Sequence, residues 1–208
     1  MNSFIIEQNT FLSRSVKAFF DLDYIGFGQV GNPDFINVLK NTFNKESEVN
    51  INNAANECYC YIYNFLNNIS LPYWAMEYPY YVCALPRSKA DFSANQLIFR
   101  DVIRIALENL SRSELRNGLS FINRHTSVKT THIKNDTGWN TGDLPYPGIT
   151  KNTCNLSDEI KGKNIILIDD IYTKTVNVIE DCVQALINCG ARDIIVYTVA
   201  RTAYKGAK

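Results

Sequence analysis

The sequence has no excess of charge of either sign and no hydrophobic run that approaches the roughly 20 residues of a membrane span. Lysine and arginine total 21 in the 208 residues, and aspartate and glutamate also total 21. A balanced chain has no global positive field that would attract nucleic acid or anionic lipid. The first residues, MNSFIIEQNTFLSRS, lack the basic start and cleavage site of a signal peptide. We therefore expect a cytoplasmic protein with no membrane partner.

The six cysteines also lack the spacing of a metal site. No CxxC pair occurs, and the side chains of Cys58 and Cys60 would diverge on a helix. No second pair completes a tetrahedral zinc set. Most of the cysteines lie within apolar segments, which is typical of reduced, buried thiols in a cytosolic protein. We expect no zinc.

The first third of the chain carries apolar stripes at helical spacing. They lie at residues 11–20, 33–43 and 54–66. We therefore predict a helical N-terminal lobe over residues 1–78 that packs on an α/β core over residues 79–208.

Within this core, runs typical of buried strands alternate with amphipathic segments. Strands are predicted at 80–85, 119–122, 164–168 and 194–199, and helices at 93–107 and 178–187. This alternation predicts an α/β fold with a mostly parallel twisted sheet flanked by helices. A long polar connection at about 124–158 is typical of a functional lid.

Ligands of such sheets bind beyond the carboxyl ends of the strands. The polar residues at these ends are Arg87, Ser88 and Lys89, then Arg124 and His125, then Asp169 and Asp170. The last group belongs to NIILIDDIYTKTVN, residues 164–177, where an apolar run ends in two acids and a hydroxyl-rich turn leads into a helix. Carboxylates can accept hydrogen bonds from ribose hydroxyls, and backbone N–H groups at a helix start can hold a phosphate. The segment therefore predicts a sugar-phosphate site.

Each of these features also has a simpler interpretation. One acid of an isolated pair can cap the following helix while the other is solvated at a strand end. Residues 173–177 can be an ordinary capped turn, and Lys174 can point to solvent rather than to phosphate. Residues 87–89 can be a solvated turn after Pro86.

The segment IILIDDIYTKTVN, residues 165–177, resembles the phosphoribosyl-pyrophosphate (PRPP) binding motif of type I phosphoribosyltransferases. CALPRSKADFSANQ, residues 83–96, is similar to the pyrophosphate loop of the ComF-like branch, and RHTSVKTTH, residues 124–132, is similar to its lid. The segment GKNIILIDD, residues 162–170, which leads into the acids, and the final strand ending at Arg201 are also similar to the family. The chain departs from the family in lacking a glycine within 173–177, and so lacks a residue that readily adopts positive φ beside a phosphate.

The resemblance implies a cytoplasmic glycosyltransferase of nucleotide metabolism. It would bind PRPP with Mg²⁺ and transfer the phosphoribosyl group to an unknown acceptor, releasing pyrophosphate. Asp169 and Asp170 would be catalytic, engaging the ribose hydroxyls and reaching Mg²⁺ through water. The 5′-phosphate of the same ligand would be held by Thr173, Lys174, Thr175, Val176 and Asn177. Its pyrophosphate would be held by Arg87, Ser88 and Lys89.

The long connection supplies further candidates. Arg124, His125, Lys129 and Lys134 could lie on a lid that closes over pyrophosphate, or on a solvated loop. His132, Trp139 and Tyr146 could stack on a base or anchor the loop.

The alternative to turnover is a catalytically weak or inactive PRPP or nucleotide sensor that partners a DNA-handling protein in DNA uptake or defence. The resemblance also implies a homodimer. A phosphoacceptor receiver domain is a distant third interpretation, because its acids follow the first strand rather than a late one.

Overall fold

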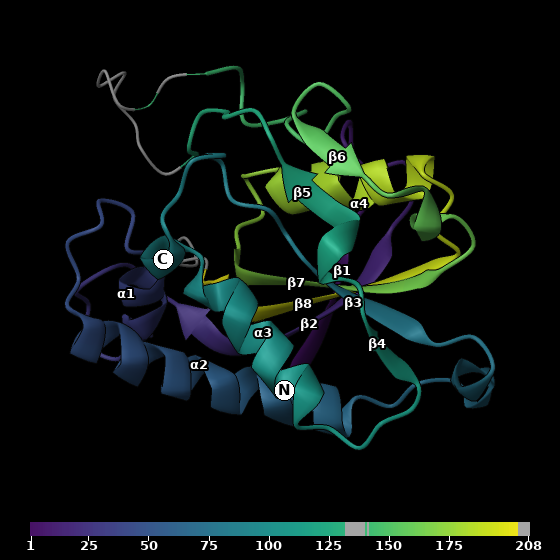
Figure 1. Ribbon diagram of the computed structural model, residues 1–208, viewed down its shortest axis with the longest axis horizontal. Helices are drawn as coiled ribbons and strands as arrows, with labels where there is room; N and C mark the ends of the chain where they lie inside the picture. The colour runs from purple at the N-terminus through teal and green to yellow at the C-terminus, as the bar shows by residue number, and fades with distance from the viewer. Residues whose placement is uncertain (132–139, 141, 204–208) are drawn as a thin grey trace, which may run out of the picture.

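The computed structural model describes residues 1–131, 140 and 142–203, and its main feature is a six-stranded sheet in the order β1-β2-β8-β7-β3-β4 (Figure 1). The strands are β1 (Asn2–Ile6), β2 (Val16–Tyr24), β3 (Tyr80–Ala84), β4 (Leu115–Asn117), β7 (Asn164–Tyr172) and β8 (Asp193–Thr202). All neighbouring pairs are parallel except β1 with β2. The predicted mostly parallel sheet is thus confirmed.

Helices cover both faces of this sheet (Figure 1). Helices α1 (Phe35–Lys40), α2 (Glu48–Asn68) and α3 (Ile98–Glu108) pack on one face, and α4 (Val178–Asn188) packs on the other. A two-stranded antiparallel ribbon of β5 (Ile122–Arg124) and β6 (Cys154–Leu156) joins the α4 side. Within the described part of the chain, no helix combines the length and the apolar character needed to cross a membrane.

The residues of β7 alternate between two hydrophobic cores. Ile166 and Ile168 face the core shared with α1, α2 and α3, whereas Ile165 and Leu167 face the core shared with α4. A strand that is covered on both faces needs apolar residues at every position. This explains the continuous apolar run in the sequence.

Helix α2 forms for reasons that the sequence shows. The Ser47 hydroxyl accepts a hydrogen bond from the Asn50 N–H at 3.2 Å and so caps the first turn. A stripe that includes Ile62 and Phe65 is buried against the sheet, where the Phe65 ring stacks on Tyr197 with centroids 3.9 Å apart. The predicted helix at 54–66 is confirmed. The one predicted at 33–43 is shorter, because Asn41 adopts a left-handed conformation and ends α1.

The helix predicted over residues 11–20 is wrong. Residues 2–6 and 16–24 form β1 and β2, and β2 pairs with β8 inside the sheet. Helical and strand periods cannot be separated in an apolar run this short, and aromatic residues such as Phe19 and Phe20 pack equally well on a pleated surface. The N-terminal residues therefore contribute two strands as well as α1 and α2. A purely helical lobe is not confirmed, and the boundary at residue 78 stays a prediction.

The strand predicted at 119–122 is also wrong. The sheet strand is β4, at residues 115–117, and Leu119–Phe121 form a 3-10 turn before β5. Gly118 explains the change of direction, because a Cβ atom there would lie 3.0 Å from both Cys83 Sγ and Tyr81 Cβ. A side chain at this position would require its neighbours in β3 to shift by a few tenths of an ångström. Arg124 consequently ends the ribbon strand β5, and His125 follows it, rather than either following a strand of the six-stranded sheet.

Candidate functional site

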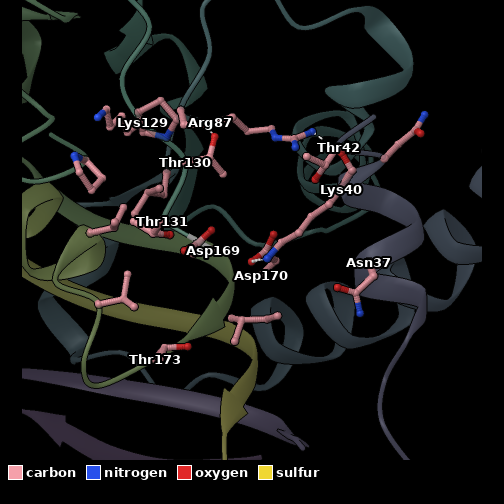
Figure 2. A pocket seen from close by; sticks show the side chains of 18 of the residues that line it. Asn37, Lys40, Thr42, Arg87, Lys129, Thr130, Thr131, Asp169, Asp170 and Thr173 are labelled. Atoms are coloured by element: carbon pink, nitrogen blue, oxygen red, sulfur yellow. Dashed lines mark hydrogen bonds and ion pairs between the residues drawn. The ribbon is translucent and has the colours of Figure 1, made fainter. Parts of the chain in front are cut away.

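A cavity of about 790 Å³ lies at the carboxyl edge of the sheet. Its wall is built by the end of β7, the loop after β3, helix α1 with the residues that follow it, and the start of the 124–158 connection. Figure 2 shows side chains from these elements converging on one space, among them Lys40, Arg87, Lys129, Asp169, Asp170 and Thr173. Segments that are distant in sequence thus form one site.

Asp169 and Asp170 both line this cavity (Figure 2). They lie within β7 rather than after it, because β7 continues to Tyr172 and keeps pairing with the long strand β8. Asp169 lies opposite Thr198 in this pairing. The sequence therefore placed the acids at the correct edge of the sheet, and the strand that carries them is longer than predicted.

Lys40 pairs with one of these acids. Its Nζ lies 3.0 Å from Asp170 Oδ1, and the two side chains are 23% and 20% exposed. Lys40 stands in the last turn of α1, which is an ordinary place for a lysine because the helix dipole favours a cation there. Its contact with an acid 130 positions later could not be inferred from the sequence.

Asp169 is half-buried in the wall of the cavity. Desolvation raises its pKa well above the usual aspartate range, and the neighbouring charge of Asp170 raises it further, while Lys40 and Arg87 oppose the shift. Asp169 therefore keeps its proton to a higher pH than an exposed aspartate. A carboxyl group of this kind can donate as well as accept hydrogen bonds, which is common at functional sites.

Arg87 is held by backbone groups rather than free to follow a ligand. One guanidinium nitrogen, Nη1, donates to the carbonyls of Lys40 and Gln96, both at 2.5 Å. The guanidinium also stacks 3.9 Å above the ring of Phe92. Burial lowers the pKa of Arg87, and the charges of Asp170 and Asp169 partly restore it. Arg87 thus supplies a fixed positive charge and ties the loop after β3 to the end of α1.

The other two residues of the predicted pyrophosphate loop differ in position. Ser88 lines the cavity, and its Oγ lies 2.7 Å from Thr130 Oγ1, which also lines it. Lys89 is buried, and this burial lowers its pKa.

In the predicted phosphate loop, residues 173–177, some residues line the cavity and others do not. Thr173 and Val176 line the cavity, whereas Lys174 and Thr175 are exposed. The amide of Val176 donates to the Thr173 carbonyl at 2.9 Å, so the turn itself uses it. Thr173 Oγ1 lies 2.6 Å from Thr202 Oγ1. The side-chain oxygen of Asn177, at the start of α4, accepts a hydrogen bond from Asn9 at 3.1 Å.

Two buried acids in the first turn of α4 were not anticipated as parts of the site. Asp181 Oδ2 accepts hydrogen bonds from the amides of Gly148 and Ile149, at 2.6 and 2.8 Å. Glu180 Oε1 accepts one from the Tyr172 hydroxyl at 3.0 Å. Burial raises the pKa of both acids. When ionised, they face the positive end of the helix dipole, which weakens its attraction for a phosphate.

The long connection lies against the loop after β3. The Val128 amide donates to the Ser88 carbonyl at 2.8 Å, and Arg124 Nε donates to the Arg87 carbonyl at 2.5 Å.

The predicted lid residues of this connection differ in position. Lys129 lines the cavity. His125 is exposed, with its Nδ1 2.9 Å from Thr126 Oγ1. Tyr146 packs edge-on against Phe11, with centroids 5.1 Å apart, which favours its role as a loop anchor. The remaining candidates, His132, Lys134 and Trp139, lie outside the described residues.

The acid pair by itself offers a magnesium ion few protein ligands. Among residues 1–131, 140 and 142–203, no group of three or more histidine, cysteine, aspartate or glutamate side chains is placed to hold a metal. The Lys40 ammonium group also takes one oxygen of Asp170. Mg²⁺ prefers octahedral oxygen coordination, and an ion held by these two carboxylates would have to complete its shell with water or ligand oxygens.

Thiol chemistry is not prominent near the site. Cys58, Cys83, Cys154 and Cys182 are buried, Cys189 is half-buried and Cys60 is exposed, and all are free. Burial raises the pKa of Cys83 to about 12. The buried thiols therefore stay protonated and unreactive at neutral pH.

Comparison with known proteins assigns this chain to no family: no family model matches it, and no curated protein sequence matches it significantly.

Proposed function

We propose that the cavity binds phosphoribosyl pyrophosphate and that the chain transfers the phosphoribosyl group to an acceptor, with release of pyrophosphate. The observation that carries this proposal is the position of Asp169 and Asp170 at the carboxyl edge of a mostly parallel sheet, beside the cations Lys40 and Arg87. Ribose needs acceptors for its hydroxyls, and phosphate needs positive charge. The cavity lining offers both.

The size and polarity of the cavity support a ligand of this class. Its volume of about 790 Å³ lies within the range of roughly 300–1,000 Å³ that is usual for small-molecule sites. Hydroxyl groups of Thr130 and Thr173 and the charges of Lys40, Arg87 and Lys129 supply polar groups among the apolar lining. This mixture suits a phosphorylated sugar better than an apolar ligand.

Loss of pyrophosphate from PRPP would build positive charge on the ribose ring as the bond breaks. Asp169 and Asp170 are held near this position before the reaction, so they would stabilise the charge without reorganising. Arg87 would face the departing negative charge, and the loop packed on Ser88 would limit the entry of water. A magnesium ion arriving with the ligand would neutralise its diphosphate.

A second candidate function is a sensor that binds the same ligand without turnover. It is favoured by residues 173–177, where the turn uses the Val176 amide and Asn9 engages the Asn177 side chain. The acids Glu180 and Asp181 further reduce the positive character of this helix start. Such a sensor would partner a protein that handles DNA in uptake or defence.

Calorimetric titration with PRPP and Mg²⁺ tests binding, and pyrophosphate release with a panel of nucleobases and ammonia tests turnover. We expect the wild-type protein to bind PRPP and Asp170→Asn to bind it at least about tenfold more weakly, since a ribose acceptor and a charge are lost. Asp158→Asn, at an exposed position on another segment, is the matched control and should bind as wild type does.

The two assays separate the two candidates. Pyrophosphate release that depends on an acceptor supports the transferase. Binding without release for any acceptor supports the sensor. Absence of PRPP binding would contradict both.

A further inference from the structure

The acid pair of the cavity already has a cation in contact with it. Lys40 Nζ lies 3.0 Å from Asp170 Oδ1, and about four fifths of each side chain is shielded from solvent. Because the two groups are largely covered by protein, water and salt screen their attraction less than they screen an exposed ion pair. Figure 2 shows the Lys40 side chain extending from α1 across the cavity wall to this carboxylate. The acid pair is therefore partly neutralised by the protein itself.

Both the backbone and the helix end hold Lys40 in this place. The carbonyl of Lys40 accepts a hydrogen bond from Arg87 Nη1 at 2.5 Å. Asn41, the next residue, has φ of 38° and ends α1, and its side-chain oxygen accepts hydrogen bonds from the amides of Lys45 and Glu46, at 2.8 and 3.1 Å. The backbone at Lys40 is thus anchored on both sides, which fixes the point from which its side chain reaches the acid.

A divalent ion that bound Asp170 Oδ1 would have to displace this ammonium group, and one bound to the neighbouring oxygens would lie close to it. Two cations within about 4 Å of each other repel strongly in a partly buried site. The described residues also offer the ion no third acidic ligand, so the two carboxylates would be its only acidic ligands and Lys40 competes for one of them. Lys40 and a bound metal are thus alternatives for one position.

We propose that Lys40 is a built-in counter-ion that takes the place of a divalent metal at Asp169 and Asp170, so that the site receives a phosphorylated sugar without a resident metal. The ligand class in this statement rests on the proposed function, whereas the competition between Lys40 and a metal does not. Lys40 is a specificity-determining residue in this account. It favours a ligand whose hydroxyl groups contact the acids directly over a ligand that contacts them through a bound metal ion.

The first test measures Mn²⁺ binding directly, by electron paramagnetic resonance of the free ion. We expect the wild-type protein to bind Mn²⁺ weakly and Lys40→Met to bind it at least about tenfold more tightly, because a repelling charge is removed and a carboxylate oxygen is freed. Lys45→Met is the matched control: it removes a lysine from the exposed rim of the same cavity, away from the acid pair, and should bind as wild type does. Adding Asp170→Asn to Lys40→Met should abolish the gain.

The opposite results would overturn the inference. Wild-type protein that binds Mn²⁺ as tightly as Lys40→Met, or a gain that survives Asp170→Asn, would show that Lys40 does not hold the metal position. A merely structural ion pair would change thermal stability in Lys40→Met and leave Mn²⁺ affinity unchanged. If Lys40→Met does not fold, Lys40→Gln serves the same comparison with a polar side chain, and Lys40→Arg, which keeps the charge, should retain weak Mn²⁺ binding.

The second test uses ribose 5-phosphate, a phosphorylated sugar without a diphosphate that would chelate metal. Its affinity for wild-type protein should change less than about twofold on addition of EDTA, whereas Lys40→Met should gain affinity when Mn²⁺ is supplied. Affinity of the wild-type protein that collapses in EDTA would contradict the inference. A chain that binds neither ribose 5-phosphate nor PRPP would refute the proposed function, and the Mn²⁺ comparison would still decide the role of Lys40.

Discussion

Strand β7 changes character between Ile168 and Asp169. From Ile165 to Ile168 every residue is fully buried and packs into one of two hydrophobic cores. From Asp169 to Ile171 the residues are half-buried, and the two acids face the cavity. The same hydrogen-bonded pairing with β8 continues through both halves. The first half stabilises the fold, and the second half uses that rigidity to hold two carboxylates close together at some cost in stability.

The largest effect should come from the apolar half. Ile166→Ala removes a fully buried side chain from the core shared with the helices α1, α2 and α3 and should lower the free energy of unfolding by about 3 kcal/mol. Ile105→Ala, at a position in α3 that is 41% exposed, is the control and should lower it by less than about 1 kcal/mol. Urea denaturation measures both. Equal losses of unfolding free energy in the two variants would show that burial of Ile166 does not contribute more to stability than the exposed Ile105 does.

The acidic half should respond in the opposite direction at Asp169. Asp169→Asn removes a carboxylate that the protein desolvates and that Asp170 repels, so it should raise the free energy of unfolding at pH 7 by about 1.5 kcal/mol. The same substitution should abolish PRPP binding. Thermal denaturation without ligand provides the comparison, and a loss of stability would show that Asp169 is held by favourable contacts instead.

The pH dependence follows from the same carboxyl group. Its pKa is raised in the native state, so the native protein binds this proton more tightly than the unfolded chain does. The contribution of Asp169 to the free energy of unfolding therefore falls as pH rises from the ordinary aspartate range through the raised pKa, and it stays low above that value. The stabilisation by Asp169→Asn should accordingly be present at pH 7 and vanish below the ordinary aspartate range. A pH-independent difference between the variant and wild type would contradict this assignment.

Asp170 should differ in sign from its neighbour. Asp170→Asn removes the partner of Lys40 and should lower the free energy of unfolding by about 1 kcal/mol, because the pair is largely shielded from solvent. The comparison with Asp169→Asn is sharp, since the two substitutions are chemically identical and adjacent. Stabilisation by Asp170→Asn would show that repulsion between the acids outweighs the pair with Lys40.

The smallest effect is expected outside the cavity wall. Lys174 is exposed, and Lys174→Ala should change the free energy of unfolding by less than about 0.5 kcal/mol. PRPP affinity should change by less than about threefold. A larger loss of affinity would place the 5′-phosphate on the 173–177 turn, as the sequence motif suggests, and would move the binding site toward α4.

Sequence reasoning succeeded where a pattern is local and long. The apolar runs of β3, β7 and β8 and the stripe of α2 are buried as their periodicity predicts. The sequence-based predictions were wrong where contacts between distant segments determine the secondary structure. Residues 16–24 could suit a helix or a strand, and pairing with β8 settled the choice. The turn at Gly118 depends on contact with β3, which no local pattern reveals.

The candidate site shows the same limit. The sequence identified the acids of β7 as the informative feature, and the structure has them in a cavity. Lys40 and Asp181 were missed, because their partners lie 130 and about 30 residues away and a lysine in a last helical turn or an acid in a first one is ordinary. The polar wall that completes the site is a product of tertiary packing.

The most direct test of the central claim is a crystal structure of the protein with PRPP bound. We expect the ribose hydroxyls within hydrogen-bonding distance, about 2.5–3.2 Å, of the Asp169 and Asp170 carboxylates, with the phosphate groups toward the cations Lys40, Arg87 and Lys129. A ligand bound elsewhere, or bound in this cavity with its hydroxyls away from both acids, would contradict it.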